Sequence, residues 1–369
     1  MRVWLLSDIH IGLKNNNLDW LHACEDYFSQ FFYPNIHRLE GYDDTLIVCG
    51  DVFENRQTIG LLSQKLAMDI FTDLGEFFKG GVYVLCGNHD ILYKNSNTVT
   101  SLECLKNIPN VNVIQEPQML NIGKHRLLLM PWSANAKAEK ETLTAFADEK
   151  PEYCFCHTEI MGAKNNRSTT VNKGANDIDD FGGIKHTYSG HIHYRQEMKG
   201  ITFLGSPFST TRNDKGNIKG FYILDLDKGE HTFIENTFSP KFVEYKLDDI
   251  ADLTVEECHK LFNNNIVDVN VTPEQIKGCV FERFLDLLKS DTRSLNINMV
   301  GDSDFSFDGT LEYEGSQMKD LMEYIVDYVT ILGESKGWSE KLTAKITNTS
   351  KSLIDKIKDK MKYSINTIE

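Results

Sequence analysis

Short apolar runs alternate with amphipathic segments over the first two thirds of the chain. Apolar runs of this length, flanked by turn residues, predict strands. Between two of them, residues 61–78 repeat apolar side chains at a spacing of three to four, which predicts a helix. Strands that alternate with helices indicate an α/β domain with a largely buried sheet. The apolar runs are 3–6, 46–49, 82–86, 127–130, 153–156 and 187–189.

Two further parts are predicted from the order of the later elements. Three hairpin-like strands complete a first domain at residues 1–240, and a mixture of helices and strands predicts a small α+β unit at residues 241–312. Thr272 before Pro273 fits an N-cap followed by proline at the first helical position. The hairpin strands are 200–204, 220–225 and 231–236; the α+β unit combines helices at 254–263 and 273–288 with strands at 266–271 and 295–300.

Residues 313–369 are predicted to form a helical C-terminal region, with helical patterns at 317–332 and 340–363. The second helix has a stripe that is too thin for an interior helix and too apolar for a fully solvated one. We expect either the first domain or a partner to cover this stripe. From residue 336 onward the chain has eight lysines against four acidic residues. The stripe consists of Leu342, Ile346, Leu353, Ile357 and Met361.

Composition narrows the class of protein. A length of 369 residues predicts more than one folding unit, since single cores stop growing at about 250–300 residues. No run approaches the roughly 18 apolar residues of a membrane span, and residues 1–7 read as a strand, so neither a membrane segment nor an export signal is expected. The eight cysteines form no CxxC pair, which predicts buried thiols and a reducing cytoplasm.

The net charge argues against a protein that coats nucleic acid by bulk electrostatics. The chain carries a formal charge of −15 at pH 7 and has an isoelectric point near 5.2, whereas phosphate binding normally leaves a basic footprint. Any contact with DNA is therefore expected to be local or mediated by metal ions.

Five of the predicted strands lead into residues that can bind a metal ion. This is where ligands lie in open α/β sheets. Taken singly, an Asp-x-His pair is typical of a surface turn, a lone histidine after a strand is typical of a cap or a core, and the preceding glycines fit ordinary turns. Together they supply carboxylate, amide and imidazole ligands without cysteine. The strand ends carry Asp8 and His10; Asp51; Asn88, His89 and Asp90; His157; and His191 and His193.

This mixture of oxygen and imidazole ligands predicts a centre with two divalent metal ions. It suits manganese, iron or zinc better than magnesium alone, because magnesium prefers oxygen ligands and keeps its waters. A pair of cations needs a shared carboxylate. Asp51, which stands between the other contributors in chain order, is expected to bridge the two metals.

The motifs DxH, GD, GNHD, H and GHxH, in this order, resemble those of the calcineurin-like metallophosphoesterase superfamily. The resemblance spans residues 8–193 and implies one role for each motif residue. His89 is implied to be no ligand but to face the substrate, with Asp90 positioning its ring. Asp8, His10, Asp51 and His193 are implied around one metal, and Asp51, Asn88, His157 and His191 around the other.

Within the superfamily, the chain resembles the SbcD-type nuclease subunits of DNA double-strand-break repair, and phage-encoded relatives are similar in size. The similar segments are DIH, GDVFE, GNHD, CHTE, SGHIH and the turn Gly205-Ser206-Pro207. The resemblance implies a β-sandwich flanked by helices, a capping domain at 241–312 and a helical tail. Glu54 and Asn55 stand where many relatives carry histidine, which bears on how a DNA end is guided.

The resemblance implies a manganese-dependent DNA nuclease that acts as a 3′–5′ exonuclease and single-strand endonuclease. It also implies a homodimer and an SMC-like coiled-coil ATPase partner, gripped by the tail. Basic residues near the ligand segments are candidate DNA contacts, although each is also typical of a solvated loop. The alternatives are a metallophosphatase or cyclic-nucleotide phosphodiesterase for a small substrate, and a non-catalytic scaffold. The candidate DNA contacts are Lys164, Arg167, Lys173, Arg195 and Arg212.

Overall fold

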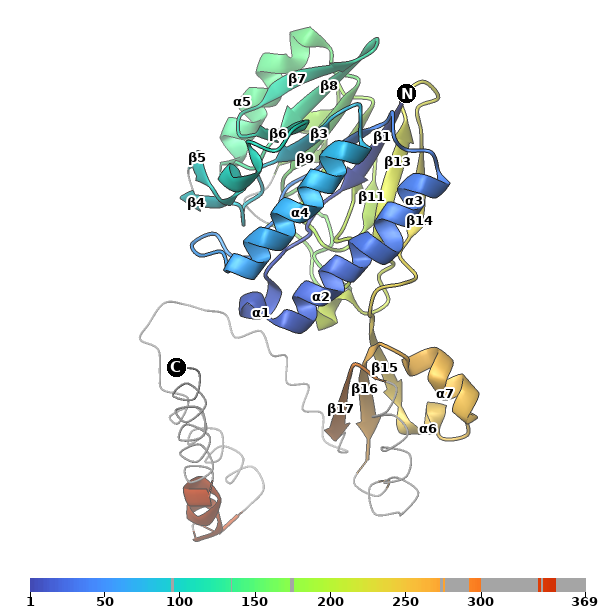
Figure 1. Cartoon of the computed structure of the whole chain (residues 1–369). Coiled ribbons are helices and arrows are strands. Elements are labelled where there is room, and N and C mark those ends of the chain that lie inside the picture. The colour runs from blue at the N-terminus through green and yellow to red at the C-terminus, as the bar shows by residue number, and fades with distance from the viewer. Residues whose placement is uncertain are drawn as a thin grey trace, which may run out of the picture. The chain divides into compact units, whose positions relative to one another are not determined.

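The structure, a computed structural model, forms two compact units, Met1–Asp302 and Ser303–Glu369. Within the second unit, residues 341–349 are helical. The predicted helix at 317–332, most of the one at 273–288 and the remainder of 340–363 lie outside the described residues. The strands and helices below belong to the first unit (Figure 1). The structure describes residues 1–93, 96–133, 135–172, 176–272, 275, 292–299, 338–339 and 341–349.

The first sheet has six strands in the order β14-β13-β1-β2-β3-β6. Its β1, β2, β3 and β6 run parallel, while the β13–β14 hairpin adds two antiparallel strands beside β1. The parallel strands are all short and largely buried, as the apolar runs in the sequence predict. The bounds are β1 (Arg2–Leu6), β2 (Thr45–Val48), β3 (Val82–Leu85), β6 (Val111–Ile114), β13 (Gly220–Asp225) and β14 (Glu230–Glu235).

The second sheet also has six strands, in the order β11-β12-β10-β9-β8-β7. The four central strands are parallel, and the two edge strands pair antiparallel with their neighbours. A separate hairpin, β4 (Ile91–Tyr93) and β5 (Ser96–Thr100), follows β3. The bounds of the second sheet are β7 (Gln118–Ile122), β8 (His125–Met130), β9 (Tyr153–His157), β10 (His186–Gly190), β11 (Gln196–Met198) and β12 (Ile201–Phe203).

Helices cover the outer face of each sheet. On the first sheet, α2 and α3 are joined by a π-helix, and α4 lies beside them (Figure 1). The side chain of Asn17 caps α2 by accepting hydrogen bonds from two backbone N–H groups. None of the helices in the described residues is long and apolar enough to cross a membrane. The bounds are α1 (Leu13–Asn16), α2 (Leu18–Asp26), the π-helix (Tyr27–Phe32), α3 (Tyr33–Arg38), α4 (Leu61–Phe77) and α5 (Ala136–Phe146).

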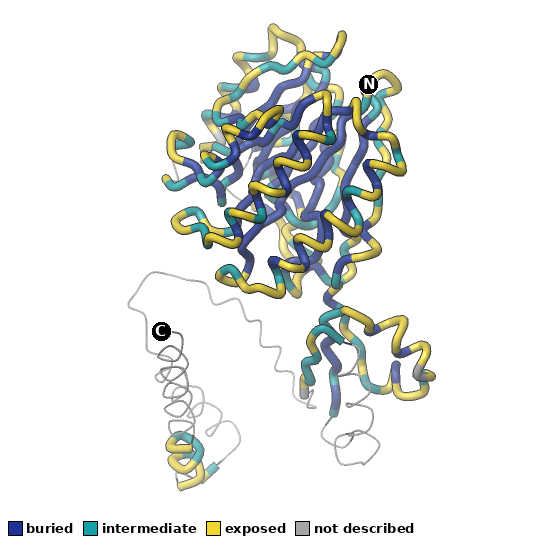
Figure 2. The backbone as a smooth tube through the Cα atoms, in the orientation of Figure 1, coloured by how far each residue is buried: buried dark blue, intermediate teal, exposed yellow. Residues whose placement is uncertain are grey.

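Alternate residues of each strand belong to different cores, because successive side chains of a strand point to opposite faces. Trp4 packs in the core beneath α2 to α4, whereas Leu5 packs between the two sheets. In β8, Leu129 faces the first sheet and Leu128 packs in the core that includes Leu143 of α5. Buried backbone therefore fills the middle of the region formed by the two six-stranded sheets (Figure 2). The prediction of mixed α/β sheets flanked by helices is confirmed.

A parallel three-stranded sheet follows, in the order β15-β16-β17. Its strands and helix agree with the predictions for 266–271, 295–300 and 254–263 to within about one residue. The sheet has its own core, which includes Phe262 and Val269. The division into domains at residue 240 stays a prediction. The bounds are β15 (Phe242–Lys246), β16 (Ile266–Val271), β17 (Ser294–Met299), α6 (Leu247–Ile250) and α7 (Val255–Phe262).

Candidate metal centre

The predicted ligands lie at the carboxyl ends of strands from both sheets. Turns after β1, β2 and β3 of the first sheet approach the end of β9 and the turn after β10 of the second. His157 is the last residue of β9, and the other ligand residues follow their strands by one to four positions. The seven side chains therefore reach one place although they are up to 185 residues apart (Asp8 to His193).

Asp8, His10 and His193 form a first cluster with ligand atoms within 4.8 Å of one another. The Nε2 atoms of His10 and His193 face each other at 2.8 Å, and His193 Nε2 lies 3.8 Å from Asp8 Oδ1. Burial, together with the charge on His10, lowers the pKa of His193 to about 4. His193 is therefore neutral at pH 7 and has a lone pair available for a metal ion.

Asp51, His157 and His191 form a second cluster, and the side chain of Asn88 joins it. Asn88 Oδ1 lies 2.9 Å from His157 Nε2 and 2.7 Å from His191 Nδ1. His157 Nδ1 donates to the backbone carbonyl of Cys49 at 2.7 Å. That bond leaves Nε2 of His157 as the nitrogen that can bind a metal.

Asp51 lies between the two clusters. Its Oδ2 is 3.4 Å from His157 Nε2 and 3.7 Å from His10 Nε2, and its Oδ1 accepts a hydrogen bond from the backbone N–H of His89 at 2.8 Å. The position fits the bridging role predicted from the sequence. The assignment of each ligand to a metal stays a prediction.

The charges and unpaired atoms of the site fit cations. Asp8 Oδ2 is buried and has no hydrogen-bond partner. Burial alone would lower the pKa of His157, but the charges of Asp51 and Asp8, together with hydrogen bonds to Asp51 and to the Cys49 carbonyl, outweigh it and raise that pKa to about 10. A buried carboxylate oxygen without a partner and imidazoles held in a negative field are the environment that a divalent metal stabilises.

The backbone of the site is also unusual. Asp8, His10, Asp51 and His191 have φ values of 54°, 52°, 54° and 78°, in the left-handed region that non-glycine residues rarely adopt. Glycine is required at position 87 for lack of space rather than for its backbone angle, because a Cβ there would overlap the carboxylate and backbone nitrogen of Asp51. Backbone strain of this kind clusters at functional sites.

Comparison with known proteins fits this geometry. A family model described as calcineurin-like phosphoesterase matches residues 1–195, more than half of the 369-residue chain. The chain belongs to this family. Exonuclease subunit 1 of Enterobacteria phage T4 is 25% identical over 343 residues, which cover 91% of this chain and 95% of the phage protein. It is a distant homologue over most of the chain.

Two solved structures are also similar. One is an archaeal phosphodiesterase, with a TM-score of 0.32 and 14% identity, covering 64% of this chain and 100% of its own. The other is a protein of unknown function from Aquifex aeolicus, with a TM-score of 0.26 and 16% identity, covering 45% of this chain and 81% of its own. Membership of the phosphoesterase family implies bound divalent metal ions, and the clusters of His and Asp side chains are candidate sites for them.

The role predicted for Asp90 beside His89 is wrong in its geometry. Asp90 is fully buried, and its carboxylate accepts backbone N–H groups of Val52, Phe53 and Gly87 at 3.3, 3.1 and 2.9 Å. It thus ties the GNHD turn to the GDVF turn. His89 Nδ1 instead donates to the backbone carbonyl of Glu54 at 2.6 Å. The adjacency of His89 and Asp90 in sequence misled the prediction, because their side chains leave the turn in different directions.

Three residues around the ligands were not predicted as part of the site. The carboxylate of Glu54 lies 2.8 Å from His10 Nδ1, and Glu159 Oε1 lies 3.0 Å from His191 Nε2. Trp132 stacks on His191, with ring centroids 4.8 Å apart. A carboxylate on the far nitrogen of a ligand histidine fixes the ring and strengthens it as a donor. The motifs GDVFE and CHTE contain both glutamates, so this signal was present in the sequence.

The basic residues predicted to bind DNA fall into two groups. Arg195 donates to the carbonyl of Ile218 and to Tyr222, and Arg212 forms a two-pronged ion pair with Asp268 of β16. These two guanidinium groups therefore have structural partners. Lys164 and Arg167 are exposed, whereas Lys173 lies outside the described residues.

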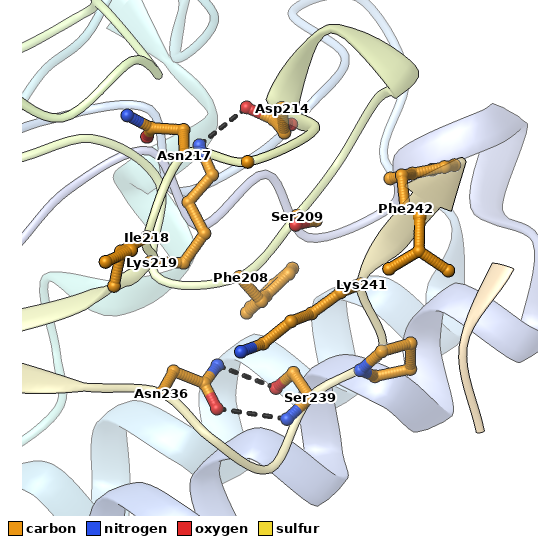
Figure 3. Close-up of a pocket in the computed structure, with 13 residues that line it drawn as sticks. Phe208, Ser209, Asp214, Asn217, Ile218, Lys219, Asn236, Ser239, Lys241 and Phe242 are labelled. Carbon is orange, nitrogen blue, oxygen red and sulfur yellow. Dashed lines mark hydrogen bonds and ion pairs between the residues drawn. The ribbon is translucent and has the colours of Figure 1, made fainter. Parts of the chain in front are cut away.

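The loop that follows β12 contacts the metal cluster at His193. Lys219 and Asp214 form a buried ion pair at 2.5 Å beside a cavity of about 170 Å³ (Figure 3). Thr210 Oγ1 lies 3.5 Å from His193 Nδ1. The same loop carries Arg212, and it therefore connects a ligand histidine to the three-stranded sheet.

Proposed function

We propose that the protein is a metal-dependent DNA nuclease, with 3′–5′ exonuclease and single-strand endonuclease activity, in an SbcCD-like recombination and repair complex. The observation that carries the proposal is the similarity to an exonuclease subunit over 91% of this chain. The convergence of the two ligand clusters supports phosphodiester hydrolysis at this site. The acidic surface charge is compatible with DNA binding that is local to the site.

Different residues of the chain would have different roles in hydrolysis. When bound, two divalent cations, which we propose to be manganese, would activate a water molecule as nucleophile and neutralise the phosphate. Asp51 would hold the two cations together. His89, with Nδ1 bound to the carbonyl of Glu54, keeps Nε2 available to protonate the leaving 3′-oxygen. General acid catalysis of this kind contributes about 10²–10⁴-fold.

A metallophosphatase or cyclic-nucleotide phosphodiesterase is the alternative, because the same centre can serve a small substrate. The extent of similarity beyond residue 195 favours the nuclease, since the match to the phage subunit continues through most of the chain. Small phosphoesters need no three-stranded sheet with a core of its own. We therefore propose that residues 241–312 form a capping domain beside the nuclease domain 1–240.

A direct test compares two substrates in manganese. Purified protein is assayed with labelled single- and double-stranded DNA and with p-nitrophenyl phosphate, and the His89→Ala variant serves as the control for contamination. Cleavage of DNA by the wild type that falls by about 10²-fold or more in the variant is the expected result. Hydrolysis of the small ester alone would favour the alternative. No activity on either substrate would favour a scaffold.

We further propose an SMC-like coiled-coil ATPase as partner, bound by residues 313–369. The support is the amphipathic stripe and the lysine excess of that region. Deletion of residues 335–369 is expected to spare basal cleavage of single-stranded DNA and to abolish ATP-stimulated cleavage of duplex ends when the ATPase is added. A truncated protein that unfolds or loses basal cleavage would contradict this role.

A homodimer is proposed as the assembly state. In the described part of the chain, two adjacent leucines at the start of α4 are exposed, Leu61 at 83% and Leu62 at 59%. Exposed apolar side chains of this size, about two turns of helix from the exposed Met68, are typical of a protein interface. Light scattering of the Leu61→Asp, Leu62→Asp variant should then report a monomer where the wild type is a dimer, and an unchanged mass would contradict the proposal.

A further inference from the structure

A second polar cavity lies beside His89. It has a volume of about 270 Å³, and Lys14, Asn15, Asn55 and Arg56 line it together with Glu54 and His89. Residues 12–15 and 54–56 come from the turns that follow the first and second ligand motifs. Because His89 lines this cavity, a substrate whose leaving oxygen meets His89 extends toward it.

The charge of this cavity is positive although the chain as a whole is acidic. Its lining contains the side chains of Lys14 and Arg56, and neither takes part in an ion pair with a described residue. The carboxylate of Glu54 lies 2.8 Å from His10 Nδ1, so its charge is already engaged. By contrast, Arg195 and Arg212 are held by Tyr222 and Asp268. Two uncommitted cations therefore remain next to the candidate proton donor.

The backbone around both cations is held in place by side-chain hydrogen bonds. Lys14, Asn15 and Asn16 have φ values of 54°, 58° and 60°, a run of left-handed residues that is costly without support. Asn16 Oδ1 supplies that support, since it accepts from Ser63 Oγ at 2.6 Å and from the backbone N–H of Gly60 at 3.2 Å. This bond joins the turn of Lys14 to the start of α4.

The turn of Arg56 is built in a similar way. Asn55 Oδ1 accepts from the backbone N–H groups of Gln57 and Thr58 at 2.9 and 3.4 Å. A side-chain cap of this type fixes the turn without using its basic residue. Both cations are thus presented from pre-organised loops, which lowers the entropic cost of binding an anion.

We propose that Lys14 and Arg56 bind the phosphodiester next to the scissile one, on the leaving-group side of a polynucleotide substrate. This inference rests on the nuclease function proposed above. The planar guanidinium of Arg56 matches two phosphate oxygens, and the ammonium of Lys14 acts as a point charge. A mononucleotide or aryl ester lacks the second phosphate and cannot use this site. The pair therefore favours polynucleotides over small phosphoesters.

The test removes the charge from either side of the contact. Two single-stranded thymidine oligonucleotides are compared in manganese, one natural and one with a neutral methylphosphonate at the linkage on the 5′ side of the scissile phosphate, which is the side of the leaving 3′-oxygen. The wild type is expected to prefer the natural substrate by about tenfold or more in kcat/KM, as for a charged hydrogen bond. The Lys14→Ala, Arg56→Ala double variant should lose this preference. The Lys79→Ala variant, at an exposed lysine beyond the far end of α4, should keep it.

Each outcome decides a separate question. Cleavage of DNA with the same preference in the double variant and the wild type overturns the role of Lys14 and Arg56 and leaves the nuclease proposal intact. A double variant that loses the same factor on both oligonucleotides and on bis(p-nitrophenyl) phosphate, which has no second phosphate, also overturns it. If the wild type cleaves bis(p-nitrophenyl) phosphate but neither oligonucleotide, the proposed nuclease function fails, and this inference fails with it.

Discussion

Lys219 donates a hydrogen bond from Nζ to the backbone carbonyl of His193 at 2.6 Å. The same ammonium group forms the 2.5 Å ion pair with Asp214, and both side chains are about 95% buried. Asp214 in turn accepts backbone N–H groups of Thr210 and Thr211 at 2.9 Å. One buried ion pair thus holds the last ligand motif against the loop that follows β12.

Replacement of Lys219 by methionine should therefore weaken both folding and metal binding. The change leaves Asp214 as a buried charge without a counter-ion, which costs about 3–5 kcal/mol of unfolding free energy. It also removes the donor that holds His193, so manganese affinity should fall by about 10–100-fold. Urea unfolding of the metal-free protein and a manganese titration measure the two effects.

The double variant Asp214→Asn, Lys219→Met separates the charge from the support of His193. It should recover much of the stability, because the uncompensated charge is gone, but not the metal affinity. The Lys79→Met variant should match the wild type in both measurements. Full recovery of metal affinity in the double variant would show that Lys219 acts only through folding.

Asp51→Asn should reduce activity at saturating manganese at least about tenfold more than Asp8→Asn. Asp51 Oδ2 lies within 3.7 Å of a histidine from each cluster, whereas Asp8 contacts His193 and the backbone of His191. Each substitution removes one charge, but only the first uncouples the two clusters. Equal residual rates in the two variants would contradict the bridging position.

Much of this site could be predicted from the sequence because its ligand residues lie close in sequence to the ends of strands. His157 ends an apolar strand and each of the other ligands follows one by a few residues, so strand prediction also locates the ligands. The supporting contacts could not be predicted, since Lys219 and Thr210 meet His193 only through tertiary structure. Asp90 shows the same limit, because adjacency in sequence does not reveal which way a side chain points in a turn.

The helical segment before β2 escaped prediction for a different reason. Its π-helix, Tyr27–Phe32, contains three buried aromatic residues, Tyr27, Phe28 and Phe32, while Ser29 and Gln30 are exposed. Phe32 packs edge-on against Trp4 of β1 and Phe28 packs edge-on against Phe32. The exposed residues leave the segment amphipathic, so the missed prediction is not explained by burial. The π-helix adds about one residue to the helical turn and so disrupts the period on which helix prediction depends.

Glu54→Gln should affect metal affinity rather than proton transfer. The carboxylate of Glu54 faces His10 Nδ1, whereas its backbone carbonyl holds His89, and the substitution alters only the first contact. Manganese affinity is expected to fall by about tenfold, with turnover at saturating manganese within a factor of about three of the wild type.

His89→Ala should show the reverse pattern, with both metals bound and turnover reduced by about 10²-fold. Elemental analysis with steady-state kinetics distinguishes the two, and loss of a metal in His89→Ala would make His89 a ligand.

Gly87→Ala should disrupt the centre although it replaces no ligand residue. A methyl group at this position would overlap the Asp51 carboxylate and backbone nitrogen, so either the GNHD turn or Asp51 must move. Asn88 and His89 lie on that turn, and Asp90 ties it to Val52 and Phe53. Overpacking of this kind costs about 1–3 kcal/mol of stability, and the movement of Asp51 should reduce manganese affinity in addition.

Gly183→Ala is the matched control, because a Cβ at Gly183 meets no atom within 4 Å. This variant should leave the melting temperature and the manganese titration unchanged. Wild-type manganese affinity in Gly87→Ala would show that the turn can relax without displacing Asp51, and the close approach of the two turns would then not be required for metal binding.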